Sequence, residues 1–408
     1  MKNADVIIVG GGASGLFASI QSAWQGKSVM VIEHMKMPGK KLLITGKGRC
    51  NVTNNSDVEN IMANIPRNPR FMYSSLSRFS AEDTMAFFES LGVELKTERG
   101  SRVFPASDKS SDIVDTLIVT AKDAGVIFVT DEIHELIIEQ GQAIGVKGQN
   151  SYFADRIIVA TGGKSYPKTG STGIGYELAK QAGHHVADIS PSLCPMVTEE
   201  KTPAEMMGLS LRNCTLSLYE KEKSKPFFSE LGEMLFTHFG ISGPLVLSAS
   251  AHMDNLEKDK YTVAIDLKPA LSYEKLDERI LRDFSEFPNR DFSNSLNKLL
   301  PSKMIDVVVK LSGIPPYKKV NQITHVEREN LVKLLKNMRF HIKSLRPIDE
   351  AIITRGGVDV KEISPKTMES KLVKGLYFIG EILDVDGYTG GFNLQIAFST
   401  AYAAAMAD

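Results

Sequence analysis

The first forty residues contain the feature that most restricts the fold of this 408-residue chain. Residues 6–9 form a continuous β-branched run, which is typical of a strand buried on both faces. The glycine-rich segment 10–15 (GGGASG) follows, then a helical pattern, and a second apolar run over 29–32 ends at Glu33. This order of strand, glycine turn, helix, strand and acid predicts a parallel βαβ unit that binds a dinucleotide.

Each residue type in this unit has a physical task. Gly10 permits the tight turn out of the strand, Gly12 lets a pyrophosphate approach the backbone, and Gly15 lets the helix pack closely on the sheet. The free N–H groups at the helix N-terminus attract phosphate. Glu33, 18 residues after Gly15, can accept hydrogen bonds from ribose hydroxyls, and an acid there disfavours a 2′-phosphate. The expected contacts with the dinucleotide are Gly10, Gly12, Ala13, Ser14, Gly15, Glu33 and His34.

Two later segments favour FAD over NAD. The apolar run 156–159 leads into a small-residue turn, and the run 376–379 leads into a Gly-Glu pair before a helix rich in small residues. The N-terminus of that helix could face the anionic edge of a flavin. This layout resembles that of flavoproteins with two dinucleotide-binding domains. The expected cofactor contacts in these segments are Ala160, Thr161, Gly162, Gly380, Glu381, Gly391, Asn393 and Leu394.

Longer motifs sharpen the resemblance. They are residues 38–54 (PGKKLLITGKGRCNVTN), 162–173 (GGKSYPKTGSTG), 237–244 (THFGISGP), 354–358 (TRGGV) and 380–395 (GEILDVDGYTGGFNLQ). Together they resemble the BaiN/HI0933-like family of bacterial FAD-dependent oxidoreductases, which includes aminoacetone oxidases. The resemblance implies bound FAD, an oxidoreductase and a body of three domains. Roles in the family range from oxidising a small aminoketone to reducing a steroid-like bile acid intermediate, so the resemblance does not identify the substrate.

The loop within the first of these motifs is rich in glycine and in basic and polar residues. Its glycines allow the backbone to follow a phosphate, its cations supply charge for a pyrophosphate, and its amide and hydroxyl groups supply hydrogen bonds. The alternative is a solvated basic turn. The expected cofactor contacts in this motif are Lys41, Gly48, Arg49, Asn51 and Thr53.

The two ends of the chain should meet on one FAD, because the glycine turn and the Gly-Glu pair lie far apart in sequence. We therefore expect an α/β fold with a discontinuous Rossmann-like FAD-binding domain over residues 1–190 plus 346–408. Residues 191–270 contain strictly alternating apolar segments, which predict an inserted β-barrel or sandwich that contributes to the substrate site. Residues 271–345 show apolar residues at helical spacing, which predicts an inserted helical subdomain.

Composition excludes several classes of protein. With 48 Lys and Arg against 49 Asp and Glu, the chain gives no overall electrostatic reason to expect nucleic acid. No apolar run approaches the ~18 residues of a membrane span. The N-terminal residues do not resemble a secretory signal. The three cysteines form no CxxC pair, so we expect no metal site and reduced thiols in the cytoplasm. Oligomeric state is left open.

The electron route has two alternatives because the chain contains a single complete dinucleotide fingerprint and no CxxC pair. Either the substrate reduces the flavin and oxygen reoxidises it, or NAD(P)H docks transiently at the flavin. The preferred hypothesis is oxidation of a small amine or aminoketone by hydride transfer to flavin N5, with oxygen as acceptor. The alternatives are an NAD(P)H-dependent reductase of unsaturated or steroid-like compounds, and a flavoprotein that acts on RNA.

Three residues are candidate catalytic groups. His238 is the best candidate base by residue type, since its ordinary pKa is closest to neutrality. The alternative for His238 is a structural histidine that holds a turn. Asp384 and Tyr388, together with Asp386, follow the Gly-Glu pair and could line the same cleft. The alternative for these residues is ordinary turn chemistry.

Overall fold

The computed structural model describes residues 3–254 and 260–407. The chain divides into two compact units. The first combines Met1–Ser192 with Pro347–Asp408, and the second is Leu193–Arg346. Within the described residues, none of the helices combines the length and the apolar character that crossing a membrane requires.

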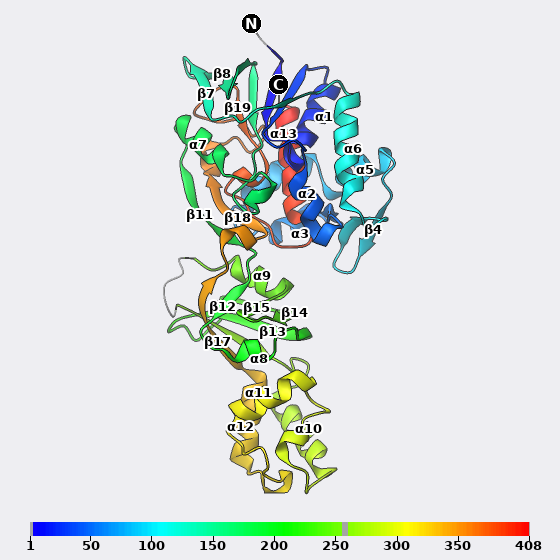
Figure 1. Ribbon diagram of the computed structural model, residues 1–408, viewed down its shortest axis with the longest axis vertical. Helices are drawn as coiled ribbons and strands as arrows, with labels where there is room; N and C mark the ends of the chain where they lie inside the picture. Colours follow the sequence, from blue (N-terminus) through cyan, green and yellow to red (C-terminus); the bar gives the residue numbers. More distant parts are fainter. Residues whose placement is uncertain (1–2, 255–259, 408) are drawn as a thin grey trace. The chain divides into compact units, whose positions relative to one another are not determined.

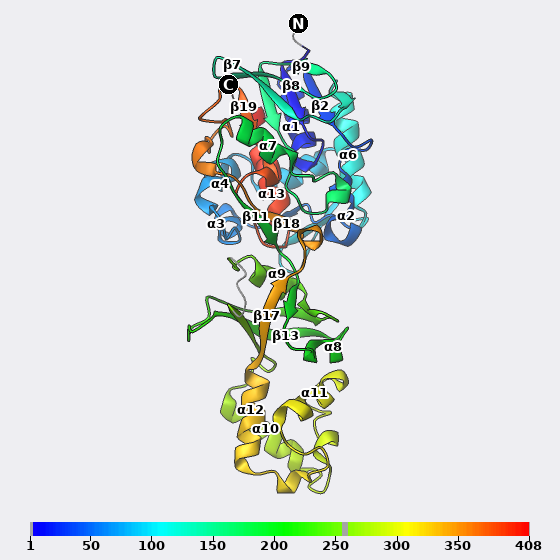
Figure 2. The same cartoon turned by 60° about the vertical axis from the view of Figure 1, so that its left-hand side comes forward.

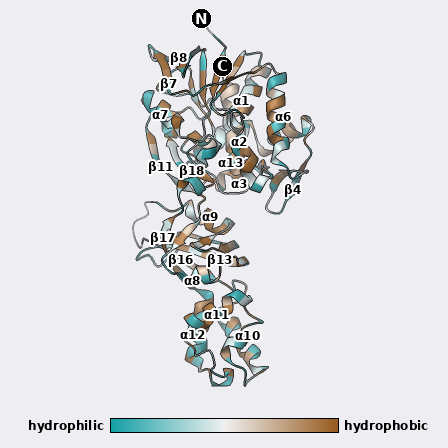
Figure 3. Ribbon diagram, in the orientation of Figure 1, coloured by the Kyte–Doolittle hydropathy of each residue, from teal (hydrophilic) through white to brown (hydrophobic). Residues whose placement is uncertain are grey.

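A five-stranded parallel sheet forms the centre of the first unit (Figure 1). Its spatial order is β19-β10-β1-β2-β6, and β1 is hydrogen-bonded to β10 on one side and to β2 on the other. The middle strands are buried on both faces, as their continuous apolar runs predict (Figure 3). The strands are β1 (Val6–Val9), β2 (Val29–Glu33), β6 (Ile127–Thr130), β10 (Arg156–Val159) and β19 (Leu376–Phe378).

The first and last helices of the chain pack against each other beside this sheet. In Figures 1 and 2, α1 (Ala13–Trp24) lies beside α13 (Phe392–Ala405). The ring of Phe17 in α1 lies 5.2 Å from the ring of Phe398 in α13, measured between centroids. The discontinuous unit is therefore closed by apolar packing between its two ends. The other helices of this unit are α2 (Lys40–Ile44), α3 (Val58–Ala63), α4 (Pro69–Arg78), α5 (Ala81–Ser90), α6 (Ser110–Asp123) and α7 (Ile174–Gln181).

Three smaller antiparallel sheets surround the parallel sheet. One consists of β3 (Thr53–Asn54), β5 (Arg102–Pro105) and β4 (Leu95–Glu98). Another consists of β7 (Glu135–Glu139), β8 (Gln142–Lys147) and β9 (Ser151–Phe153). The third pairs β11 (Val186–Ser192) with β18 (Ile353–Val358), which precede and follow the second unit in sequence.

The second unit contains a closed six-stranded antiparallel barrel of order β12-β15-β14-β13-β16-β17. Cys214, Leu216 and Leu218 alternate along one strand and are all buried, as period-two patterning predicts. Of the two sequence alternatives, a barrel and a sandwich, the structure contains the barrel. Its strands are β12 (Met196–Thr198), β13 (Ser210–Glu220), β14 (Phe228–Phe236), β15 (Gly240–Ser242), β16 (Tyr261–Asp266) and β17 (Met338–Leu345).

The second unit also contains helices. The pattern of apolar residues on one face and polar residues on the other is visible along α10, α11 and α12 (Figure 3). The predicted class, α/β with an inserted barrel and inserted helices, is confirmed. The helices are α8 (Thr202–Glu205), α9 (Pro244–Ser250), α10 (Tyr273–Ser285), α11 (Ser302–Ser312) and α12 (His325–Lys336).

One predicted boundary needs correction. Strand β17 belongs to the barrel, although the sequence pattern placed residues up to 345 in the helical subdomain. Met338, Phe340 and Ile342 are buried and alternate with exposed residues, so the period changes from helical to two directly after α12. The division of the second unit into two subdomains stays a prediction.

Candidate cofactor and substrate site

The glycine turn after β1 has the geometry that its predicted task requires. Gly10 has φ +104°, and a Cβ there would lie 2.7 Å from the Ala160 carbonyl oxygen. A Cβ on Gly15 would lie 1.9 Å from the Gly10 carbonyl oxygen. In contrast, a Cβ on Gly12 would meet nothing within 4 Å. Packing therefore requires glycine at 10 and 15, whereas Gly12 borders open space into which a ligand could approach the backbone.

The start of α1 and the end of β2 meet at this turn. No side chain caps α1, so the amides of Ala13 and Ser14 lie at a helix N-terminus without a side-chain acceptor. The Gly11 amide donates a hydrogen bond to Glu33 Oε2 at 2.7 Å. The Met35 amide donates to Glu33 Oε1 at 2.8 Å. These two bonds fix the Glu33 carboxylate, while Oε2 keeps a lone pair for a ribose hydroxyl.

A hollow opens at the carboxyl edge of the parallel sheet, where open α/β folds bind their ligands. Gly10, Glu33, His34 and Thr161 are among the residues that line it. His34 Nδ1 lies 3.1 Å from Glu33 Oε1. The Thr161 hydroxyl oxygen is buried and has no hydrogen-bond partner among the described residues, so a ligand atom could satisfy it. These features fit the adenosine end of a dinucleotide.

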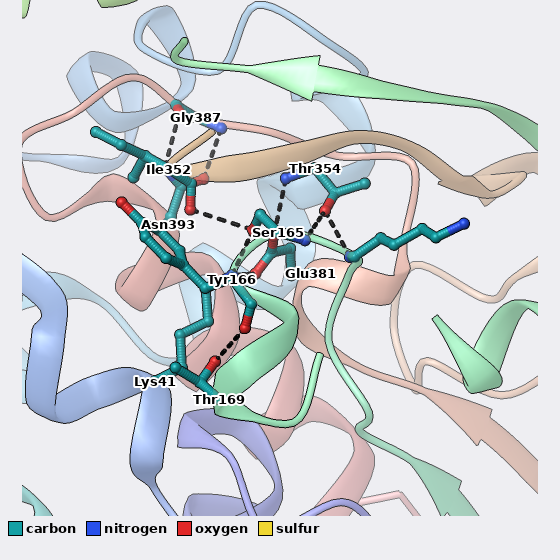
Figure 4. Close-up of polar contacts among 10 residues, drawn as sticks. Lys41, Ser165, Tyr166, Thr169, Ile352, Thr354, Glu381, Gly387 and Asn393 are labelled. Carbon is teal, nitrogen blue, oxygen red and sulfur yellow. Dashed lines mark hydrogen bonds and ion pairs between the residues drawn. The ribbon is translucent and has the colours of Figure 1, made fainter. Parts of the chain in front are cut away.

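A polar network joins the carboxyl ends of β10 and β19 (Figure 4). Lys41 Nζ donates to Glu381 Oε2 and to Ser165 Oγ, each at 2.7 Å. The Thr354 amide donates to Glu381 Oε1 at 2.8 Å. Thr354 Oγ1 in turn accepts from the Lys164 amide at 2.7 Å. The Glu381 carboxylate therefore joins four separate segments, and its predicted contact with the cofactor stays a prediction, as does that of Lys41.

The sequence pattern did not single out two residues of this network, Ser165 and Thr354. Both lie inside the motifs at 162–173 and 354–358, so the motifs carried a signal for them. The adjacent Gly163 explains the close approach, since a Cβ there would lie 2.3 Å from Thr354 Oγ1. No local spacing rule links these segments.

The N-terminus of α13 is built against strand β3. Gly391, at the N-cap, has φ +100°, and a Cβ there would lie 2.2 Å from the Thr53 carbonyl oxygen. The Asn54 side-chain amide donates to the Gly390 carbonyl at 2.9 Å. Thr53 Oγ1 donates to Gln395 Oε1 at 2.6 Å. Thr53 therefore positions the helix start through buried contacts with its own chain, and its predicted contact with a cofactor stays a prediction.

Asn393 holds the turn that leads into this helix. Its Oδ1 accepts from the Gly387 amide at 2.8 Å, and its Nδ2 donates to the Gly387 carbonyl at 2.7 Å (Figure 4). No side chain caps α13, so the amides of its first turn, including that of Leu394, carry the positive end of the helix dipole. The side chain of Asn393 is thus a positioning group for the segment that offers this dipole.

Arg49 is held by acidic side chains of its own unit. Its guanidinium pairs with Glu98, donates through Nε to Asp108 Oδ1 at 2.6 Å, and lies 4.1 Å from the centroid of the Phe104 ring. Two carboxylates of the chain itself balance this charge, and the predicted contact of Arg49 with the cofactor stays a prediction. Gly48, with φ +84°, lies in the same loop and allows its bend. Asn51 Oδ1 is buried and lacks a partner within the described residues, so it stays a candidate acceptor.

The three predicted catalytic residues are not all in one unit. Asp384, 6% exposed, forms an ion pair with Arg67 at 2.5 Å between Oδ1 and Nε. Tyr388 lies four residues later, and its amide donates to the Asn64 carbonyl at 2.9 Å. Both belong to the first unit. His238 belongs to the second unit, where it is exposed in the turn between β14 and β15. The catalytic roles of all three stay predictions.

The model of the HI0933-like protein Rossmann domain family matches residues 4–407. The chain belongs to the HI0933-like family. The predicted resemblance to BaiN/HI0933-like flavoproteins is thereby confirmed, and so are its consequences for the cofactor and the reaction class. This HI0933-like protein is an FAD-dependent oxidoreductase with a Rossmann-type FAD-binding fold.

Three curated relatives cover nearly the whole chain. A ribosomal RNA dihydrouridine synthase of Haemophilus influenzae is 36% identical over 98% of this chain and 97% of its own length. A protein of the same name from Escherichia coli is 31% identical over 100% of this chain and 98% of its own length. A 3-dehydro-bile acid delta(4,6)-reductase of Clostridium scindens is 30% identical over 98% of both chains.

A solved structure supports the fold. The open conformation of a flavocytochrome c3 fumarate reductase superposes with a TM-score of 0.53 at 16% identity. The match covers 99% of this chain and 78% of that chain. At this identity the likeness concerns the fold alone.

The residues of this HI0933-like protein fit FAD. The glycine turn and the uncapped α1 would hold the pyrophosphate, Glu33 would hold the adenosine ribose, and the α13 N-terminus would face the flavin. When bound, FAD supplies two-electron hydride chemistry, and the protein supplies orientation, electrostatics and exclusion of water.

Proposed function

We propose that this HI0933-like protein is a flavin-dependent reductase that saturates a carbon–carbon double bond conjugated to a carbonyl group. The observation that carries this proposal is the chemistry shared by the names of the three full-length relatives. A dihydrouridine synthase saturates the uracil ring bond next to a carbonyl. A delta(4,6)-reductase of a 3-dehydro bile acid saturates ring bonds conjugated to the 3-oxo group. The two substrates differ in size and charge, but the reacting group is the same.

The chain's own residues support this reaction in two ways. The uncapped N-terminus of α13 provides a partial positive charge, which stabilises negative charge that develops on a flavin or on a polarised carbonyl. The Lys41–Glu381 network and the contacts of Asn393 with Gly387 fix the segment that leads into that helix start. Preorganised dipoles of this kind favour a transition state in which a carbonyl becomes more anionic.

The electron donor in this proposal is NAD(P)H, which is the second of the two routes left open by the sequence. A single dinucleotide fingerprint, occupied by FAD, leaves the nicotinamide to dock transiently. The competing prediction, oxidation of a small amine or aminoketone with oxygen as acceptor, gains no support from the names of the three relatives.

Anaerobic spectroscopy of the FAD-loaded protein tests the proposal. We expect NADH or NADPH to bleach the flavin, and 4-androstene-3,17-dione or a ribosomal RNA fragment that contains uridine to restore its colour. Mass spectrometry should then find the organic product heavier by two hydrogens. Bleaching by aminoacetone, with peroxide on readmission of air, would support the amine oxidase instead. Reoxidation by neither unsaturated compound would contradict the proposed reductase.

The nature of the molecule that carries the double bond is a separate question. The near-zero net charge predicts a small molecule, whereas two relatives are named for ribosomal RNA. Retention of the RNA fragment, weakening steeply as salt is raised, would identify RNA as the substrate class. Reoxidation by the steroid alone would identify a small molecule.

A further inference from the structure

A buried carboxyl group lies in the loop that joins β19 to α13. Asp386 is 2% exposed. Its Oδ2 accepts a hydrogen bond from Ser192 Oγ at 2.8 Å. Its Oδ1 is buried and has no hydrogen-bond partner in the described part of the chain. A buried carboxylate oxygen without a hydrogen-bond partner costs free energy. That cost is avoided when the carboxyl group carries a proton or when a ligand supplies a hydrogen bond.

One hydroxyl group and three charged groups influence Asp386. Burial is the dominant influence and raises the pKa of Asp386 to about 6. The Ser192 hydroxyl on β11 opposes this rise, as do Arg355 on β18 and Arg67 before α4. The neighbouring Asp384 adds to the rise by like-charge repulsion. A carboxyl with a pKa near neutrality exchanges its proton readily at physiological pH, which is the property of an efficient general acid.

The loop is fixed at several points, so this carboxyl cannot simply turn into solvent. The backbones of Arg67 and Asp386 form an antiparallel bridge. Asn393 clamps Gly387 through two hydrogen bonds. The loop leads directly into the uncapped start of α13, which is the segment expected to face the flavin.

Several other buried or half-buried titratable groups of the first unit are already engaged, although the buried Tyr176 hydroxyl also lacks a hydrogen-bond partner within the described residues. The Glu381 carboxylate is paired with Lys41, and the Asp384 carboxylate is paired with Arg67. Both nitrogens of His184 are held, one by Glu362 and the other by Ser370. Asp384 Oδ1 also lacks a hydrogen bond but is ion-paired with Arg67, whereas Asp386 Oδ1 has neither a hydrogen bond nor an ion pair within the described residues.

We propose that Asp386 is the general acid of the reduction and that Ser192 is its positioning residue. This inference rests on the proposed reductase function. In the step, the π bond of the conjugated substrate breaks, a hydride from the NAD(P)H-reduced flavin forms a C–H bond at the carbon β to the carbonyl, and the Asp386 proton forms a C–H bond at the α carbon. Asp386 is left as a carboxylate facing Arg355 and Arg67, and regains its proton from water.

Infrared spectroscopy of the FAD-loaded protein tests the proton-bearing role without turnover. We expect a carboxylic acid C=O band that disappears as pH rises through about 6, a band that Asp386→Asn lacks. The exposed Asp123→Asn is the matched control and should keep the band. In Ser192→Ala, the midpoint of the band should move to higher pH, because the lost hydroxyl favoured the carboxylate. A wild-type spectrum without this band at pH 5 would overturn the inference.

Half-reaction kinetics test the donor role. Bleaching of the flavin by NAD(P)H should be equal in the wild type and in Asp386→Asn. Reoxidation by 4-androstene-3,17-dione or the RNA fragment, whichever the wild type uses, should be about 10²- to 10⁴-fold slower in the variant. The wild-type reoxidation rate should fall as pH rises through the Asp386 pKa, and Ser192→Ala should shift that fall to higher pH.

The outcomes separate the two hypotheses. If the wild type reduces a conjugated double bond and Asp386→Asn does so equally fast with the same pH profile, the donor role is wrong and the proposed function stands. If Asp386→Asn does not retain FAD, an unshifted pH profile in Ser192→Ala overturns the donor role. If the wild type reduces neither compound, the proposed function fails and the donor role fails with it.

Discussion

Lys41 Nζ lies 2.7 Å from Glu381 Oε2, although the two residues are 340 positions apart in the chain. Both side chains are about one-quarter exposed or less. The pair therefore ties the segment after the N-terminal glycine turn to the end of the last parallel strand. Together with the packing of α1 on α13, it closes the discontinuous FAD-binding unit at the edge where the cofactor is expected.

Removing Lys41 should destabilise this unit. In Lys41→Met, Glu381 loses its cation, and we expect the free energy of unfolding to fall by about 1–3 kcal/mol. The double variant with Glu381→Gln should lose less than the sum of the two single changes, because the pair is coupled. Urea denaturation of the FAD-free protein measures these values. The exposed pair Lys180–Glu177 is the control, and Lys180→Met should cost less than about 1 kcal/mol. Equal losses at the two lysines would contradict a structural role for the Lys41 pair.

Gly12 and Gly15 should respond differently to alanine. In Gly12→Ala the new Cβ meets no protein atom within 4 Å and φ is −79°, so the FAD-free protein should melt within a few degrees of the wild type. FAD affinity should nevertheless fall at least tenfold, because the methyl group occupies the space reserved for the pyrophosphate. Fluorescence titration with FAD measures this loss.

Gly15→Ala is the counterpart of that experiment. Its Cβ would lie 1.9 Å from the Gly10 carbonyl oxygen, so the turn itself must move. We expect lower thermal stability even without FAD. A Gly15→Ala protein that melts like the wild type, or a Gly12→Ala protein that binds FAD normally, would show that the turn does not have the predicted role.

The sequence predicted the structure best where an element depends on residues that are neighbours in the chain. The glycine spacing, the continuous apolar run at 6–9 and the alternation in β13 each depend on neighbours in the chain, so pattern alone predicted the parallel sheet and an inserted barrel or sandwich. Pattern could not assign Arg49, because its partners Glu98 and Asp108 lie about fifty residues away or more and nothing local predicts their approach.

The same reason explains what was missed in the candidate site. Ser165 follows β10 and Thr354 lies in β18, and the two residues meet only in the folded chain, where the Ser165 amide donates to Thr354 Oγ1. The contrast between Asp384 and Asp386 also depends on the fold. Both follow the same strand in a similar local sequence, yet one faces a guanidinium at ion-pair distance and the other faces Ser192.

Glu33 should be needed for FAD retention. Glu33→Arg removes the acceptors of the Gly11 and Met35 amides and places a cation where a ribose is expected, so the purified protein should lose most of its flavin. Glu33→Gln keeps one carbonyl oxygen and should retain an intermediate amount. The ratio of flavin absorbance to protein absorbance after gel filtration measures occupancy. Full occupancy in Glu33→Arg would contradict the ribose role.

His184 should make the stability of this protein sensitive to mild acid. Burial lowers the pKa of His184 below its ordinary value of 6.5, while its hydrogen bond to Glu362 opposes the shift. The folded protein therefore keeps the ring neutral, whereas the unfolded chain takes up a proton as pH falls through about 6.5. Because the unfolded state then binds more protons, this contribution to stability is present above pH 6.5 and is lost as pH falls below it.

Asp386, whose folded pKa is raised, contributes with the opposite sign, since its stabilisation is lost as pH rises through about 6. Both the wild type and His184→Gln contain Asp386, so its contribution cancels when their unfolding free energies are subtracted. The advantage of the wild type over the variant should then shrink from pH 8 to pH 5. A difference that stays constant over this range would show that His184 has the same pKa in both states.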